Sequence, residues 1–159
     1  MGYVEELRRF VGHRKLIMAG VRAVIHDDHG RVLLQMRGDF KLWGFPAGSV
    51  ELDESVQDAL RREVHEETAL TVVKARPFAI YSNPTYSTTY PNGDQIQPYS
   101  IGFIVDEWTG TLTPDGDESL DLRFFSLDAP PPPEQIVRAH RMMFDHIRQY
   151  LETGEMIVD

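Results

Sequence analysis

The helix expected to begin near position 55 constrains the fold most. It places carboxylates on the same face as the apolar residues that should pack in the core. At about 100° per residue, with Val56 as the origin, Leu60 and Val64 fall at about 40° and 80° on the helical wheel. Glu63 and Glu67 lie inside this apolar stripe. The sequence therefore predicts a helix that partly buries two negative charges.

A buried pair of glutamates needs a compensating charge. Neither Glu63 nor Glu67 has a basic residue three or four positions away on the helix, which argues against an ordinary solvated, salt-bridged face. Two carboxylates about 6 Å apart repel by about 3 kcal/mol at an effective dielectric constant of about 20, and burial adds a desolvation cost. A divalent cation, an arginine from elsewhere in the chain, or a proton on one glutamate would compensate. Arg62 can do this for Glu66, but not readily for the other two.

The absence of cysteine and the net charge of -9 narrow the classes of ligand and partner. A metal site has to use oxygen or nitrogen ligands, and disulfides and cysteine nucleophiles are excluded. The negative charge disfavours nucleic acid polymers but leaves small phosphorylated ligands open. No apolar run approaches the roughly 20 residues of a membrane span, and the N-terminus lacks the features of a secretory signal. We expect a cytoplasmic protein with one domain over residues 1–159.

The remaining segments predict a mixed α/β fold. Leu16 to Arg37 contains two strands, around VRAVIH and RVLLQM, joined in a hairpin by the turn-prone segment Asp27 to Gly30. Neither strand alternates cleanly between polar and apolar residues, which favours a sheet with helices on both faces. The other expected elements are a helix over Tyr3 to Val11, strands over Leu70 to Tyr81, Gln97 to Val105 and Asp121 to Leu127, a turn at Asn92-Gly93, and a closing helix from about Glu134 to Leu151.

The spacing of residues 48–70 resembles the Nudix box of the Nudix hydrolase family. Gly48 and Glu54 precede the run REVHEE at residues 62–67, and Leu70 follows at the interval of that pattern. The resemblance implies a Nudix-type α/β/α sandwich with a mixed central sheet, and Mg²⁺ or Mn²⁺ as the cofactor. It also implies hydrolysis of a diphosphate linkage in a nucleoside diphosphate linked to another moiety, such as a nucleotide sugar, ADP-ribose, dinucleotide or nucleoside triphosphate.

The resemblance further implies roles for individual residues. Glu63 and Glu67 would be metal ligands, and Glu66 would be a ligand or the base that activates water. Gly48 would form a tight turn before the helix, with its carbonyl oxygen directed at the metal. Arg62 would orient the glutamates as a catalytic-site partner.

Two loops supply further carboxylates for diphosphate hydrolysis, which needs a group that takes a proton from water. Glu51 lies in the loop before the helix, and Glu118, with Asp117 behind it, lies in the late GDESLD segment. A solvated acidic loop is the alternative for both. Glu54 matches the box but is interpreted as structural, near the helix start.

Candidate substrate contacts surround the WGFPAG loop. Arg37 and Lys41 precede it and could contact phosphate, whereas His140 falls in an apolar stripe and is interpreted as a core histidine. Aromatic side chains could stack on a base, although core or turn packing is the more common role. These side chains are Trp43, Phe45, Tyr81, Tyr86, Tyr90 and Tyr99.

Both ends of the central helix carry sequence signals. Ser55 and Asp58 resemble a capping box, in which the serine accepts from a backbone N–H and the acid reaches back. Ala69 stands where the family pattern has glycine. Alanine in the left-handed conformation that closes many helices costs roughly 1 kcal/mol, so a slightly longer helix is the alternative.

Other functions known on this fold have to be weighed. A Nudix-fold module that senses a nucleotide without cleaving it has no need for Glu63, Glu66 and Glu67 together. Isomerisation of a prenyl diphosphate uses a cysteine in the related family, and this chain has none. Hydrolysis is the favoured function, and a homodimer is possible because dimers are common among relatives.

Overall fold

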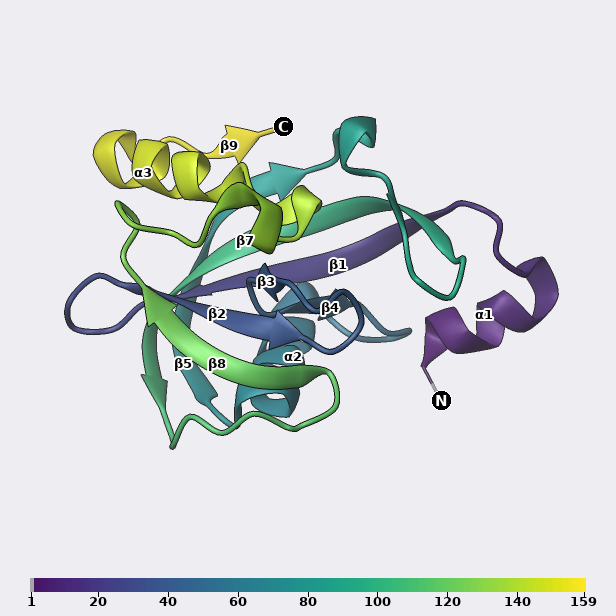
Figure 1. Cartoon of the computed structure of the whole chain (residues 1–159), viewed down its shortest axis with the longest axis horizontal. Coiled ribbons are helices and arrows are strands. Elements are labelled where there is room, and N and C mark those ends of the chain that lie inside the picture. Colours follow the sequence, from purple (N-terminus) through teal and green to yellow (C-terminus); the bar gives the residue numbers. More distant parts are fainter. Residues whose placement is uncertain (1) are drawn as a thin grey trace.

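The computed structural model describes residues 2–159 as two sheets with helices around them (Figure 1). The single-domain prediction also includes Met1, which lies outside the described residues. A six-stranded mixed sheet has the order β4-β1-β7-β5-β9, with β6 paired to β7, and an antiparallel three-stranded sheet has the order β3-β2-β8. The strands are β1 (Leu16–Ile25), β2 (Val32–Arg37), β3 (Trp43–Gly44), β4 (Ala47–Ser49), β5 (Thr71–Tyr81), β6 (Thr88–Thr89), β7 (Gln95–Thr109), β8 (Ser119–Phe125) and β9 (Ile157–Val158).

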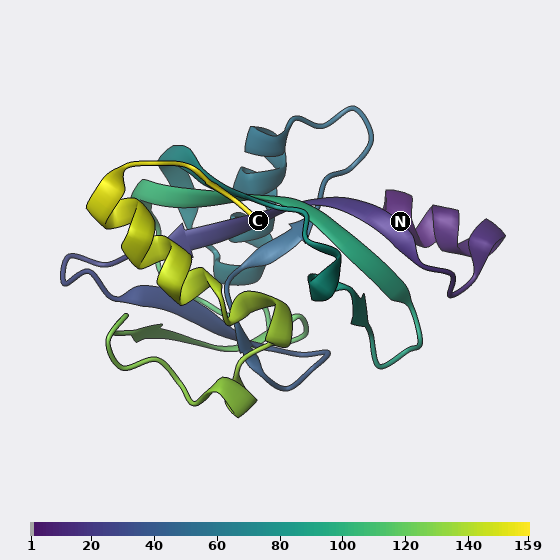
Figure 2. The same cartoon turned by 90° about the horizontal axis from the view of Figure 1, so that it is seen from above.

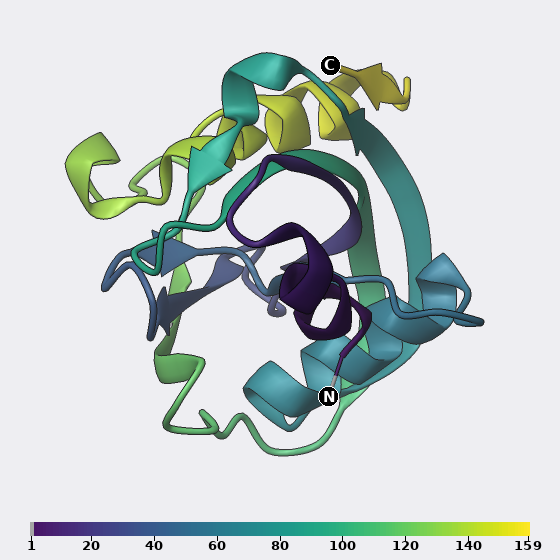
Figure 3. The same cartoon turned by 90° about the vertical axis from the view of Figure 1, so that its right-hand side faces the viewer.

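Helices cover both faces of the larger sheet, as expected for an α/β/α sandwich (Figure 2). The α-helices are α1 (Tyr3–Val11), α2 (Val56–Thr68) and α3 (Met143–Thr153). Leu60 and Val64 of α2 pack in one buried cluster with Val21, and Val24 of the same strand packs in the other cluster, with α3. Burial of a Leu or Val side chain contributes roughly 1.5–3 kcal/mol. Figure 3 shows α2 and α3 on opposite sides, with α1 across one end of the sheets.

The predicted hairpin of β1 and β2 is wrong. The two strands are joined by the expected turn, but they pair only through an isolated bridge between His26 and Val32. β1 instead runs parallel to β7 along its length and pairs with β4, whereas β2 pairs with β3 and β8. Long-range pairing has therefore replaced the local hairpin and split the two strands between sheets.

The closing helix begins later than its apolar spacing predicts. Residues 133–135 and 138–140 form separate 3₁₀ turns, and α3 starts only at Met143. Between the turns, Ile136 is extended and bridges to Trp43, whose carbonyl oxygen accepts from the N–H of Val137 at 2.9 Å. This pairing with β3 competes with the helix and brings His140 to the protein interior.

The other expected segments are confirmed with shifted ends. β7 is longer than predicted, β8 begins at Ser119, and the Asn92-Gly93 turn closes a hairpin between β6 and β7. The oxygen of Ser55 accepts from the N–H of Asp58 at 3.2 Å, but the Asp58 carboxylate accepts from the serine hydroxyl and not from the backbone. Among residues 2–159 no helix is long and apolar enough to cross a membrane.

The helix α2 ends at Thr68 and does not run on. Ala69 takes the left-handed conformation, with φ 60° and ψ 11°, and its N–H donates to the carbonyl oxygen of His65. The alternative of a longer helix is therefore wrong, and the alanine occupies the backbone position that glycine fills in the family pattern.

Candidate active site

A cavity of about 380 Å³ opens between α2, β4, β1, β7 and the 3₁₀ turn at residues 138–140, and we call it the central cavity. Its lining includes two acids of α2, Glu63 and Glu66, and also Arg22 and His140. A neighbouring cavity of about 780 Å³ shares Arg37 and Glu118 with it. Residues far apart in the sequence thus meet around one opening.

Three glutamates of α2 form what we call the acidic wall, Glu63, Glu66 and Glu67. Glu67 is 2% exposed and Glu63 is 9% exposed, which confirms that both belong to the buried stripe, whereas Glu66 is exposed. Gly48 lies in β4 and not in the predicted tight turn. A Cβ atom at Gly48 would lie 1.9 Å from Cδ of Glu63, so the absence of a side chain makes room for that carboxylate.

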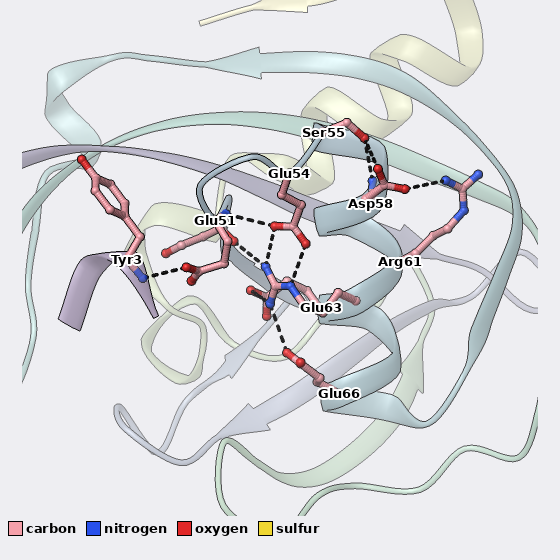
Figure 4. Close-up of polar contacts among 10 residues, drawn as sticks. Tyr3, Glu51, Glu54, Ser55, Asp58, Arg61, Glu63 and Glu66 are labelled. Carbon is pink, nitrogen blue, oxygen red and sulfur yellow. Dashed lines mark hydrogen bonds and ion pairs between the residues drawn. The ribbon is translucent and has the colours of Figure 1, made fainter. Parts of the chain in front are cut away.

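Arg62 links the acidic wall to the start of α2 through its partners Glu54, Glu63 and Glu66, which Figure 4 labels. Its guanidinium donates to Oε1 of Glu63 at 2.8 Å, to Oε2 of Glu66 at 3.1 Å and to the carboxylate of Glu54. It also donates to the carbonyl oxygen of Ser49 at 2.9 Å. The expectation that Arg62 could not readily serve Glu63 is wrong, because the side chain turns across the wall and contacts both acids.

Glu67 is the glutamate of the acidic wall whose negative charge burial disfavours most clearly. Burial raises its pKa to about 8, although the N–H of Ala47 donates to Oε2 at 3.0 Å. Burial also raises the pKa of Glu63, and Arg62 opposes that rise. Gln35 of β2 is fully buried beside Glu67 and opposes the rise in the Glu67 pKa, but neither its amide nitrogen nor its amide oxygen makes a hydrogen bond of good geometry with the described residues. Gln35 is a polar residue of the site that the sequence reasoning missed.

The donor set of the acidic wall fits a hard divalent cation. It offers carboxylate oxygens in a partly buried place, and the bare backbone of Gly48 lies against Glu63. In residues 2–159 no three acidic or histidine side chains converge on one point, since Glu63 is turned to Arg62 and Glu67 to Ala47. Rotation of these side chains toward the cavity would be needed for coordination.

Two predicted loop carboxylates lie at the central cavity. Glu118 precedes β8, and burial, with Asp115 next, raises its pKa. Glu66 and Glu63 lie close enough to interact electrostatically with it. Glu51 is bound to the start of α1, because the N–H of Tyr3 donates to its carboxylate at 2.6 Å (Figure 4).

The predicted substrate contacts fall into two groups. Arg37 lines both cavities, but its guanidinium donates to both carboxylate oxygens of Asp39, at 3.0 and 2.7 Å. Lys41 is exposed at the neighbouring cavity. Trp43 and Phe45 belong to the buried core and line neither cavity, so they have the core-packing role that is more common for such side chains and not the alternative of stacking on a base.

Arg22 of β1 was not singled out from the sequence, although it is 3% exposed and lines the central cavity. It donates to the carbonyl oxygen of Ala139 at 2.5 Å and to Oγ of Ser100 at 3.3 Å. His140 is buried, as predicted, and its Nδ1 accepts from the N–H of Phe45 at 3.0 Å. The only sequence signal for Arg22 was a charged residue within an otherwise apolar strand.

Comparisons with known proteins assign this chain to a family. The model of the NUDIX domain matches residues 16–147. An ADP-ribose pyrophosphatase of Methanocaldococcus jannaschii is 32% identical over 136 residues, covering 82% of this chain and 71% of that protein. The NAD-capped RNA hydrolase NudC of Haemophilus influenzae is 35% identical over 86 residues, which are 54% of this chain and only 29% of that protein.

A solved structure gives the same result for the fold. The MutT NUDIX hydrolase from Burkholderia pseudomallei superposes with a TM-score of 0.69 and 25% identity, over 83% of this chain and 98% of that one. Nudix hydrolases generally use divalent metal ions, in agreement with the chemistry of the acidic wall. The chain belongs to the Nudix hydrolase family.

Proposed function

We propose that this hydrolase cleaves the diphosphate bond of a nucleoside diphosphate linked to another group, and that ADP-ribose is the first substrate to test. The observation that carries the proposal is the partly buried acidic wall, of which Glu63 and Glu66 line a cavity of about 380 Å³. The archaeal relative named an ADP-ribose pyrophosphatase supports the choice of substrate. A nucleotide sugar or a dinucleotide remains within the same substrate class.

We propose that Mg²⁺ or Mn²⁺ is bound by Glu63, Glu67 and the carbonyl oxygen of Gly48, with Glu66 as a further ligand. Such an ion, when bound, polarises a phosphoryl oxygen and lowers the pKa of bound water. Arg62 fixes the directions of Glu63 and Glu66 through its hydrogen bonds. Its contacts to Glu54 and Ser49 anchor that guanidinium to the loop before α2.

Glu118 is the group that we propose to take the proton from the attacking water. Its pKa is raised, which brings a carboxylate closer to the working pH and makes it a better general base. It approaches the cavity from the loop before β8, facing the acidic wall. Glu66 is the alternative base, although its carboxylate accepts from Arg62.

We infer one domain over residues 1–159, a small phosphorylated nucleotide as the partner in the cavity, and a cytoplasmic protein that could form a homodimer. Size-exclusion chromatography with light scattering tests the dimer, and cell fractionation tests the location.

The function is tested by a phosphate-release panel with Mg²⁺ and Mn²⁺. It contains ADP-ribose, nucleotide sugars, dinucleotides, coenzymes and nucleoside triphosphates, each with and without EDTA. We expect metal-dependent hydrolysis of one diphosphate class by the wild type and by Glu152→Gln, an exposed glutamate of α3 outside the cavity. Tight binding of a nucleotide without turnover on any substrate would instead support a nucleotide-sensing module.

A further inference from the structure

The part of the central cavity that lies away from the acidic wall contains a buried cation. Arg22 is 3% exposed, and its guanidinium lies 4.7 Å from the centre of the Tyr81 ring. Its hydrogen-bond acceptors are the carbonyl oxygen of Ala139, Oγ of Ser100 and, at 3.8 Å, Sδ of Met143. All of these groups are neutral. Within residues 2–159 no carboxylate forms an ion pair with Arg22, in contrast to Arg37 and Arg62.

A buried charge of this kind is unusual. Burial lowers the pKa of Arg22 to about 10, so the guanidinium stays positive at neutral pH. Removing a charged group from water is unfavourable unless an opposite charge or a full set of hydrogen bonds replaces the water. Nη2 of Arg22 makes no hydrogen bond with the described residues, and it is not among their fully enclosed unpaired polar atoms. It therefore keeps a donor available toward the cavity.

His140 supplies a second donor beside this arginine. Nδ1 accepts from the N–H of Phe45, which assigns the proton of the neutral ring to Nε2. Burial, followed by the charges of Arg22 and Arg37, lowers the pKa of His140, so the ring stays neutral. The neighbouring Ala139 carbonyl holds Arg22, and both Arg22 and His140 line the cavity. We call this pair the arginine corner.

The arginine corner and the acidic wall lie on opposite faces of the sheet edge formed by β1 and β4. Alternate residues of a strand point to opposite faces, and Val21 packs on the α2 side, so Arg22 projects toward the α3 side. Arg22 pairs in register with Ala47 of β4, and the N–H of Ala47 donates to Glu67. The edge of the sheet thus carries a positive group on one face and the acids on the other, and the central cavity is lined by both Arg22 and Glu63.

We propose that the arginine corner binds a phosphate of the nucleotide, with Nη2 of Arg22 and Nε2–H of His140 donating to its oxygens. The role as part of the substrate site rests on the proposed function. In that role the arginine corner holds one phosphate while the acidic wall acts on the bond to the next. A phosphate is favoured over an uncharged acceptor because it would supply the negative charge that Arg22 lacks.

A binding experiment tests the phosphate contact without any turnover. ADP, AMP and adenosine are titrated by calorimetry into the wild type and Arg22→Met in EDTA, so that no metal contributes. We expect ADP to bind the wild type at least about tenfold more tightly than adenosine, and this preference to fall below about threefold in Arg22→Met. Adenosine should bind both chains alike. Arg76→Gln, which removes an exposed arginine of β5 outside the cavities, should keep the preference.

Two results would overturn the proposal. One is a wild type with no preference for ADP over adenosine, which needs no variant and so does not depend on the folding of Arg22→Met. The other is an equal loss of ADP and adenosine affinity in a folded Arg22→Met chain, which would put the guanidinium on the base or ribose. Arg22→Lys, which keeps the charge but not the two-pronged donor geometry, should retain part of the preference.

Kinetics separates this proposal from the proposed function. If both hold, Arg22→Met raises KM for the diphosphate substrate about tenfold or more and lowers kcat less. A chain that hydrolyses nothing but still needs Arg22 to prefer ADP would contradict the proposed function alone. An active chain whose KM and ADP preference ignore Arg22→Met would contradict the arginine corner alone.

Discussion

Glu67 and Arg22, an acid and a base, are both almost completely buried and lie close to the same strand, β4. The two side chains differ in how they avoid the cost of a buried charge. Glu67 can take up a proton, because burial raises its pKa to about 8, whereas Arg22 stays charged and relies on neutral acceptors. In the absence of a ligand the acid can relax and the arginine cannot. The difference separates a site that binds a cation as it loses a proton from one that keeps its charge for an anion.

The largest expected effect comes from a change at Glu67, the acidic member of this pair. Glu67→Gln removes a proposed metal ligand while preserving the shape of the side chain, so we expect kcat to fall about 100-fold or more. The change should leave the ADP preference attributed to Arg22 intact. Phosphate release and metal-free calorimetry measure the two quantities. Turnover like that of the wild type would remove Glu67 from the site.

A smaller effect tests the arginine that does have acidic partners. Arg62→Ala frees Glu63 and Glu66 from their shared donor, and we expect kcat/KM to fall roughly 10–100-fold, the usual range for a group that orients ligands. Arg61→Ala is the matched control, because the adjacent Arg61 forms its one ion pair within residues 2–159 with Asp58, on the surface. Equal losses in both variants would show that net charge matters and not the orientation of the glutamates.

The third prediction concerns pH and the metal-free chain. The folded state holds a proton on Glu67 up to about pH 8, whereas the unfolded state loses it near the ordinary value of 4.5. The free energy of unfolding should therefore decrease as pH rises between these values, by up to about 1.4 kcal/mol per unit. Urea unfolding in EDTA at several pH values measures this slope. Glu67→Gln should flatten it and stabilise the chain at pH 8, and an unchanged slope would contradict the buried acid.

The smallest effect lies outside both charged regions. Ala69 closes α2 with φ 60°, so Ala69→Gly should relieve strain and stabilise the chain by about 1 kcal/mol or less. Thermal unfolding should show an increase in Tm of about 2–4 °C at most. Turnover should be unchanged, because the proposed ligands all precede this residue. A lower Tm would mean that the alanine side chain contributes packing that outweighs its strain.

The same two charges show what the sequence can and cannot predict. The burial of Glu67 followed from helical periodicity, since its position relative to Leu60 and Val64 depends only on local geometry. The place of Arg22 depends on pairing between β1, β4 and β7, and on a 3₁₀ turn near residue 139 that contacts it. Strand partners, the late start of α3 and the approach of Arg62 to Glu63 all arise from tertiary contacts, which periodicity does not contain.

The most direct test of the central claim is calorimetric titration of Mn²⁺ and Mg²⁺ into the metal-free protein at pH 7, in two buffers with different ionisation enthalpies. We predict saturable binding with release of protons, because a cation displaces the proton from Glu67. Affinity should be at least about tenfold weaker in the variant that carries both Glu63→Gln and Glu67→Gln. A folded wild type that takes up neither ion, with or without ADP-ribose, would contradict the account.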